Sequence, residues 1–201
     1  MSSIVLYWHP MSSATPVACA LAELGVPHER VKVDITTGEQ RRPDFLALNP
    51  NGKVPTLTVD GAPMFEALAI EIWLGEQYGV KSGLWPATGT PAHLQAVSWS
   101  TWSYVTYGAQ LVRLQAASDL GTPDDAHGTA ARKSLDELLA LLDARLSQQP
   151  WMLGEAYSLV DLIVGSVIGY SAYIGAPVAA HPTTLAWLQK VQARPSMQIQ
   201  A

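Results

Sequence analysis

Two short segments of the chain could together hold the backbone and the amino group of a small peptide. The first is Asn49-Pro-Asn-Gly-Lys-Val-Pro-Thr-Leu57, in which turn residues run directly into a Val-Pro pair and an apolar run. Proline cannot donate a ladder hydrogen bond, and it pushes Val54 toward an extended conformation. A cis Val54–Pro55 bond would leave the backbone of Val54 free to pair with an extended ligand. The second segment is Phe65-Glu-Ala-Leu-Ala-Ile70, and its Glu66 could then bind the ligand's amino terminus.

The elements that must position these segments alternate between strand and helix. The apolar patterns predict strands over residues 4–8, 27–34, 56–59 and 63–65, and helices over 13–24, 43–48 and 67–78. Asp60-Gly61 between the last two strands is a strong hairpin signal. This order predicts an α/β unit with a mixed sheet.

The pattern becomes wholly helical after a segment rich in Gly, Pro and Ser. Four helices are predicted: from Thr90-Pro91 to about residue 114, over 122–146, from Ser158 onward, and over 182–191. The second carries a stripe of leucines, and the third opens with a variant capping box in which Asp161 replaces Glu. The predicted organisation is therefore an α/β domain over 1–79, a linker over 80–89 and an all-helical domain over 90–201.

Composition excludes several classes of function. Hydrophobic residues make up 48% of the 201 residues, enough for a core, and the net charge of −5 offers no basic surface for nucleic acid. The single Cys19 excludes an intramolecular disulfide framework and a Cys-x-x-Cys redox pair. The start of the chain does not read as a signal peptide, and polar residues and Pro177 interrupt the apolar run 159–180, so we expect a buried helix and a cytoplasmic protein.

The combination of these features resembles the cytosolic glutathione transferase family. The resemblance rests on Asn49-Pro-x-Gly-Lys-Val-Pro55, on Glu66-Ala-x-Ala-Ile70 and on the Ser-x-x-Asp motif inside a helical half, and it covers nearly the whole chain. It implies a thioredoxin-like N-terminal domain that binds glutathione and an all-helical C-terminal domain that contributes the pocket for a second substrate. It also implies a homodimer, in which the α/β half of one subunit faces the helical half of the other.

The resemblance places the residue that activates the glutathione thiol between the first strand and the first helix. His9-Pro-x-Ser-x-Ala-Thr15 is most similar to the serine-using classes, the plant phi type in particular, so Ser12 is the expected hydroxyl and Ser13 the reserve. Tyr7 is a rival donor, because other classes use a tyrosine near the end of this strand. Each assignment has a purely structural alternative. Either serine could serve only as the N-cap of the helix, and Tyr7 could be an ordinary aromatic residue of the strand.

A second set of residues is expected to hold the glutathione backbone and its charged ends. By the resemblance, Glu66 pairs with the γ-glutamyl ammonium and Val54 pairs its backbone with the cysteinyl unit. The complete expected set is Gln40, Arg41, Lys53, Val54, Pro55, Glu66 and Ala67.

Two positions depart from the family pattern. Ala67 stands where the family usually has Ser, which predicts weakened rather than abolished glutathione binding because the backbone N–H at the helix N-terminus remains. Pro16-Val17 stands where phi-type members carry basic residues, which leaves the class open.

An apolar second substrate needs an apolar pocket, and aromatic residues of the helical half are candidates for its wall. The candidates are Met11, Trp102, Tyr104 and Tyr107, with core and interface packing as the competing interpretation because helical spacing places them on different faces.

The predicted function is therefore conjugation of the glutathione thiolate to an apolar electrophile. Glutathione is the only cofactor-like ligand implied, since no metal or phosphate motif is present. The alternatives are a non-catalytic binding or interaction protein of the same fold, and a glutathione-dependent peroxidase or isomerase.

Overall fold

A computed structural model describes residues 2–122 and 125–198. These described residues divide into two compact units, the first comprising residues 2–84 and 195–198 and the second 85–122 and 125–194. The boundary lies inside the expected linker 80–89. Residues 195–198 were expected in the helical domain, but they group with the first unit.

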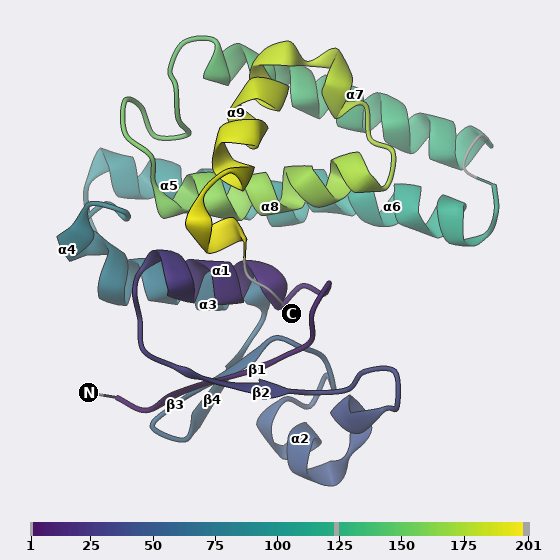
Figure 1. The fold of residues 1–201 in the computed structure, drawn as a ribbon. Helices are drawn as coiled ribbons and strands as arrows, with labels where there is room; N and C mark the ends of the chain where they lie inside the picture. Colours follow the sequence, from purple (N-terminus) through teal and green to yellow (C-terminus); the bar gives the residue numbers. More distant parts are fainter. Residues whose placement is uncertain (1, 123–124, 199–201) are drawn as a thin grey trace. The chain divides into compact units, whose positions relative to one another are not determined.

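The described residues of the first unit form a four-stranded mixed sheet (Figure 1). Its strands are β1 (Ile4–Trp8), β2 (Glu29–Lys32), β3 (Thr56–Val59) and β4 (Ala62–Phe65), in the order β2-β1-β3-β4. β1 pairs with β2 in parallel and with β3 antiparallel, and β3 and β4 form a hairpin. Asp60 and Gly61 turn this hairpin with φ angles of 50° and 84°, as the Asp-Gly pair predicted.

Helices cover both faces of this sheet. The helices α1 (Thr15–Glu23) and α3 (Ala67–Leu74) lie on one face and α2 (Pro43–Leu48) lies on the other (Figure 1). Leu6, Leu21, Leu57 and Ile70 are fully buried, so strands and helices contribute to one core.

The first unit ends in a helical extension and a returning segment. A π-helical turn, Gly75–Gly79, continues α3 into the short helix α4 (Val80–Ser82), so the expected linker begins as helix. A 3₁₀ turn, Pro195–Met197, packs on α1, where the Ser196 hydroxyl donates a hydrogen bond to the Glu23 carboxylate.

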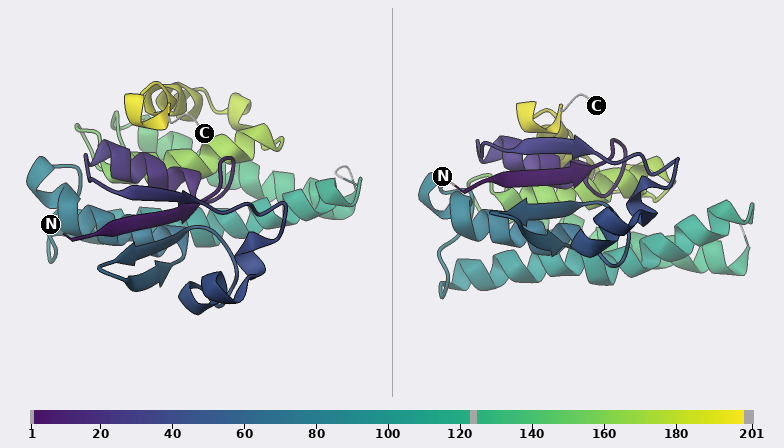
Figure 2. Two further views of the ribbon diagram at one scale, coloured as in Figure 1. Left: turned by 60° about the horizontal axis from the view of Figure 1, so that its bottom comes forward. Right: turned by 90° about the horizontal axis from the view of Figure 1, so that it is seen from below.

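Apart from an isolated β-bridge between Trp151 and Gly154, the regular elements in the described part of the second unit are helical. Its helices are α5 (Pro91–Trp102), α6 (Gly108–Asp119), α7 (Ala126–Leu146), α8 (Leu159–Tyr173) and α9 (Pro182–Gln192), with a 3₁₀ turn, Val178–Ala180, between α8 and α9. A π-helical segment, Ser103–Tyr107, joins α5 to α6, and Figure 2 shows the two helices continuing in line.

The capping box at the start of α8 is confirmed. The Ser158 backbone N–H donates to Asp161 Oδ2 at 2.9 Å, and Asp161 also accepts from the Met152 N–H and from the Trp187 indole at 2.7 and 2.9 Å. One buried carboxylate thus satisfies donors from the helix start, from the preceding loop and from α9. Within the part of the chain that the structure describes, no helix combines the length and the apolar content required to cross a bilayer.

Candidate functional site

The loop from His9 to Ala14 connects β1 to α1 and carries both candidate serines. The Ser12 hydroxyl is half-buried, donates to the His9 carbonyl at 2.6 Å and accepts from the Ala14 N–H at 3.1 Å. The N-cap residue of α1 is Ala14, and Pro16 lies in the first turn, so neither serine is the N-cap. Ser12 therefore lies just before the helix N-terminus, where its hydroxyl could interact with an anion.

Ser13 links this loop to the Val-Pro segment. Its hydroxyl donates to the Val54 carbonyl at 2.9 Å, a contact between residues 41 positions apart in sequence. The Val54–Pro55 peptide bond is cis, and Val54 is 8% exposed. The structure thus brings the two candidate serines next to the peptide-docking edge.

Asn49 stabilises the docking edge from inside the protein. It is 2% exposed, and its amide donates to the Lys53 carbonyl at 2.8 Å and to the Thr56 hydroxyl at 3.1 Å. Its side-chain oxygen accepts from the Asn51 N–H at 3.0 Å. Sequence reasoning identified Asn49 as a turn residue and missed this role, although Asn at a turn often bonds nearby backbone.

Gly52 allows residues 40–41 to approach the same loop. Its φ is 60°, and a Cβ there would lie 2.9 Å from the Gln40 carbonyl oxygen and 2.8 Å from Arg41 Nη1. Arg41 Nη1 also donates to the Asn51 carbonyl at 3.2 Å. Gln40 and Arg41 are therefore brought to the loop that carries the exposed Lys53, while the Gln40 amide donates to the Ile35 carbonyl at 3.2 Å.

Glu66 precedes α3 with an unusual backbone conformation. Its φ and ψ are 72° and 115°, and its side chain is exposed. A positive φ in a residue other than glycine is uncommon and concentrates at functional sites. Ala67, directly after it, is 6% exposed and opens the helix. The carboxylate is thus placed at a helix start and remains accessible to a ligand.

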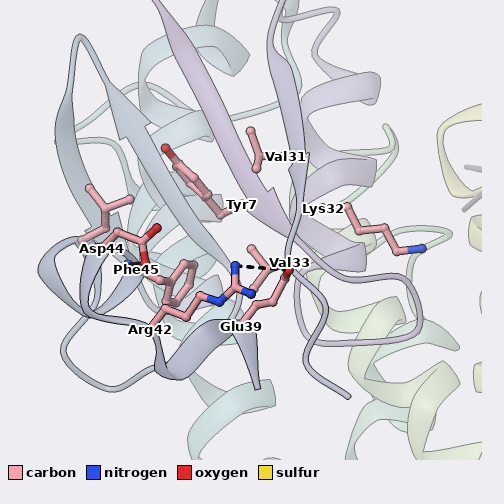
Figure 3. A pocket seen from close by; sticks show the side chains of 9 residues that line it. Tyr7, Val31, Lys32, Val33, Glu39, Arg42, Asp44 and Phe45 are labelled. Atoms are coloured by element: carbon pink, nitrogen blue, oxygen red, sulfur yellow. Dashed lines mark hydrogen bonds and ion pairs between the residues drawn. The ribbon is translucent and has the colours of Figure 1, made fainter. Parts of the chain in front are cut away.

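Tyr7 is directed toward a different part of the molecule. Its ring packs edge-on against Phe45 of α2, with the ring centroids 6.1 Å apart, on the face opposite α1. Both rings line a cavity of about 240 Å³, together with Val31, Lys32, Val33, Glu39, Arg42, Asp44 and Leu48. Figure 3 shows the two rings in this cavity. Arg42 and Glu39 form an ion pair at 3.6 Å in its rim. This position favours the strand-aromatic interpretation of Tyr7.

Cys19 lies inside α1 and is 2% exposed. Burial, reinforced by the negative charge of Glu71, raises the pKa of its thiol to about 11. A thiol with such a pKa is almost entirely protonated at neutral pH, so Cys19 is a packing residue. No group of three or more His, Cys, Asp or Glu side chains suited to a metal ion occurs among residues 2–122 and 125–198.

The proposed second-substrate residues differ widely in exposure. Met11 is 90% exposed and has a φ of 56°, and Trp102 and Tyr104 are half-buried. Tyr107 is fully buried, its hydroxyl is 2.7 Å from the Ser171 hydroxyl, and burial raises its pKa to about 12. Tyr107 is therefore a core residue of the helical unit, which corrects its inclusion among the residues expected to line a pocket.

Comparisons with known proteins agree with this arrangement. A family model described as glutathione S-transferase, N-terminal domain, matches residues 11–77, and one described as glutathione S-transferase, C-terminal domain, matches 125–190. Glutathione S-transferase 3 of Zea mays is 31% identical over 206 residues, which cover 98% of this chain and 93% of that protein. A protein of Escherichia coli named disulfide-bond oxidoreductase YfcG is 27% identical, with 96% and 92% covered. A sphingomonad glutathione S-transferase solved with glutathione has a TM-score of 0.82 and 32% identity, with 96% and 94% covered.

Proposed function

Because the chain belongs to the cytosolic glutathione S-transferase family, we propose that it conjugates the thiolate of glutathione to an apolar electrophile. In this reaction the glutathione thiol loses its proton to solvent, and the sulfur lone pair forms a bond to an electrophilic carbon. The leaving group departs with the electron pair of the bond that breaks. Where the electrophile is a strained cyclic ether, a C–O bond breaks, and the oxygen keeps the electron pair and takes a proton from solvent. Glutathione is consumed as a co-substrate.

The observation that carries the proposal is the Ser12 hydroxyl at the start of α1, next to the residue that contacts Val54. A helix N-terminus stabilises a nearby anion by roughly 0.3–1 kcal/mol. A hydroxyl hydrogen bond to a charged sulfur contributes roughly 1.5–3 kcal/mol, and releasing the His9 carbonyl costs about 0.5–1.5 kcal/mol. At the middle of these ranges the exchange gains about 1 kcal/mol, which is above the middle of the helix range, so we assign the larger part of thiolate stabilisation to Ser12.

The remaining parts of glutathione are assigned to the residues around this loop. Val54, held before Pro55, pairs with the cysteinyl backbone, and Glu66 with the adjacent Ala67 N–H binds the γ-glutamyl end. Gln40, Arg41 and Lys53 are assigned to the glycyl end, which is supported by the close approach of residues 40–41 to Gly52. For the electrophile, Met11, Trp102 and Tyr104 remain candidates because they retain exposed surface.

The test is conjugation of chlorodinitrobenzene by the native chain and by Ser12→Ala. We expect Ser12→Ala to lower kcat/KM by roughly three- to thirtyfold near neutral pH, after the cost of releasing the His9 carbonyl, and to shift the rate profile to higher pH. Ser147→Ala is a matched control, because it removes an exposed hydroxyl that donates to the Ala144 carbonyl at 2.7 Å. Equal rates for native chain and Ser12→Ala would rule out the assigned role, and Ser13→Ala and Tyr7→Phe would then be measured.

A second candidate function is binding without catalysis. Ala67 in place of Ser weakens the expected grip on glutathione, and both candidate hydroxyls donate to backbone carbonyls in this structure. Retention on immobilised glutathione without conjugation of any electrophile would favour this candidate. Turnover of a hydroperoxide or a double-bond isomer instead would identify a glutathione-dependent peroxidase or isomerase.

We further propose that the protein acts as a homodimer. Leu94, Val105 and Val112 are 66%, 61% and 69% exposed along α5, the π-helical segment and α6. All three lie along one continuous helical run, from Pro91 to Asp119, which supports a common surface. A second copy of the chain is the occupant that the family resemblance implies for such a surface.

A further inference from the structure

The hydroxyl of Ser13 joins two segments that the proposed function uses for different purposes. The loop 9–14 carries the candidate thiol-activating Ser12, and the segment 49–55 presents the backbone of Val54. The bond from Ser13 Oγ to the Val54 carbonyl, at 2.9 Å, connects them directly.

The Val54 carbonyl can serve Ser13 and a ligand together. A carbonyl oxygen has two lone pairs, so one hydrogen bond from Ser13 leaves a second acceptor position. The adjacent Lys53 carbonyl is held separately by the Asn49 amide at 2.8 Å, and Asn49 is 2% exposed. The two peptide groups that flank Val54 are therefore each held by a hydrogen bond from a side chain.

The two serines hold bonds of different reach. Ser12 donates to the His9 carbonyl, three residues away in the same loop. Breaking that hydrogen bond makes the Ser12 hydroxyl available as a donor without separating two parts of the site. Ser13 donates across 41 residues, so releasing its bond would free the Val54 carbonyl from the loop. Turning the Ser13 hydroxyl toward a sulfur therefore costs more free energy than turning the Ser12 hydroxyl.

We propose that Ser13 is a positioning residue for glutathione, which it serves by holding the Val54 carbonyl in the orientation that accepts the ligand's backbone N–H. This inference rests on the proposed function. It assigns Ser13 a role in affinity and leaves thiol activation to Ser12, so the two residues should affect different kinetic parameters.

The test compares Ser13→Ala, Ser13→Thr and the native chain in glutathione affinity, kcat and the pH profile of conjugation. Ser13→Ala should raise the calorimetric Kd for glutathione by about three- to tenfold, since one neutral hydrogen bond is lost. The pH profile should stay in place, and Ser13→Thr should restore affinity because it keeps the hydroxyl. Hydrogen–deuterium exchange in residues 49–56 should be faster in Ser13→Ala than in the native chain or in Ser147→Ala.

The outcomes separate this inference from the proposed function. Equal affinity and equal exchange in Ser13→Ala, beside a native chain that binds glutathione, would overturn the inference alone. A profile shifted to higher pH in Ser13→Ala would overturn it by making Ser13 the thiol donor. A native chain that binds no glutathione would overturn the proposed function and this inference together.

Discussion

Glu66 illustrates how a single residue can carry conformational strain at a binding site. Its φ of 72° and ψ of 115° lie outside the small left-handed region that side chains tolerate. Conformations of this kind cost roughly 1–3 kcal/mol and persist where the surrounding structure determines them. Here β4 ends at Phe65 and α3 begins at Ala67, so both flanks are fixed. The strain therefore supports a ligand-binding role for the exposed carboxylate.

Ala67 provides the prediction at this scale. Ala67→Ser restores a hydroxyl at the N-terminus of α3, where it could donate to the ligand's carboxylate. We expect the calorimetric Kd for glutathione to fall by a few-fold to about tenfold. Ala69→Ser, a half-buried position in the same helix, is the matched control. Unchanged affinity in Ala67→Ser would contradict this explanation of the departure from the family pattern.

The turn that presents Val54 could be predicted from the sequence, but the long-range contacts that hold it could not. Turn chemistry identified the segment 49–55 because Asn-Pro, Asn-Gly and Val-Pro act on the local backbone. The burial of Asn49 and the contact of Ser13 with Val54 depend on how distant segments pack, which no local pattern encodes. Tyr107 was misjudged for the same reason, because aromatic spacing on a helix does not reveal which face is buried.

At the scale of elements, a carboxylate of α7 helps to dock the start of α9 onto that helix. Asp143 of α7 accepts from the Thr184 N–H, in the first turn of α9, at 2.7 Å. Partial burial acts to raise the pKa of Asp143, but its hydrogen bonds, led by that of the Thr184 N–H, outweigh burial and lower the pKa. Asp143 therefore acts as a helix cap supplied from another element.

The sign of the resulting pH dependence follows from the lowered pKa. A carboxyl whose pKa is lower in the folded state stabilises the fold above its unfolded pKa of about 3.9 and loses this effect as the pH falls through the folded value. Asp143→Ala should therefore cost about 0.5–2 kcal/mol of unfolding free energy at pH 7 and less near pH 3. Thermal unfolding at both pH values measures this, with the exposed Glu137→Gln of the same helix as control. A deficit that is equal at pH 7 and pH 3 would exclude the ionised cap.

The elements were predicted most accurately where a proline opens the helix. α9 was expected over 182–191 and spans Pro182–Gln192, and α2 was expected over 43–48 and spans Pro43–Leu48. The helix that starts at Thr90-Pro91 was expected to end near residue 114 but extends through a π-helical segment to Asp119. No proline follows Pro91 in this run, and Gly108 adopts helical backbone angles, so nothing ends the helix earlier. α7 is capped by Asp125, which accepts from the His127 and Gly128 N–H groups, and Pro123 and Asp124 lie outside the described residues.

At the scale of the whole molecule, the change from alternating to purely helical patterns predicted the order of the two units. The returning segment 195–198 could not be predicted, because its place in the first unit depends on the contact of Ser196 with Glu23, 173 residues away. Long-range contacts of this kind are settled by tertiary packing. The family resemblance supplied what composition and periodicity could not, namely the ligand and the expectation of two subunits.

The proposed homodimer gives the prediction that concerns the whole molecule. Three large apolar side chains along one helical run, each more than half exposed, are unfavourable in water and would be buried against a second copy of the chain. Val105→Glu places a charge at the middle of the three, and burying an unpaired charge is costly. We expect it to raise the dimer dissociation constant by about tenfold or more, as measured by sedimentation equilibrium over a concentration series. Leu141→Glu on α7, at a position that is 48% exposed, adds the same charge away from this surface and should leave the dimer intact. A native chain that sediments as a monomer at micromolar concentration would contradict the homodimer, and a Val105→Glu dimer as tight as the native one would place its interface elsewhere.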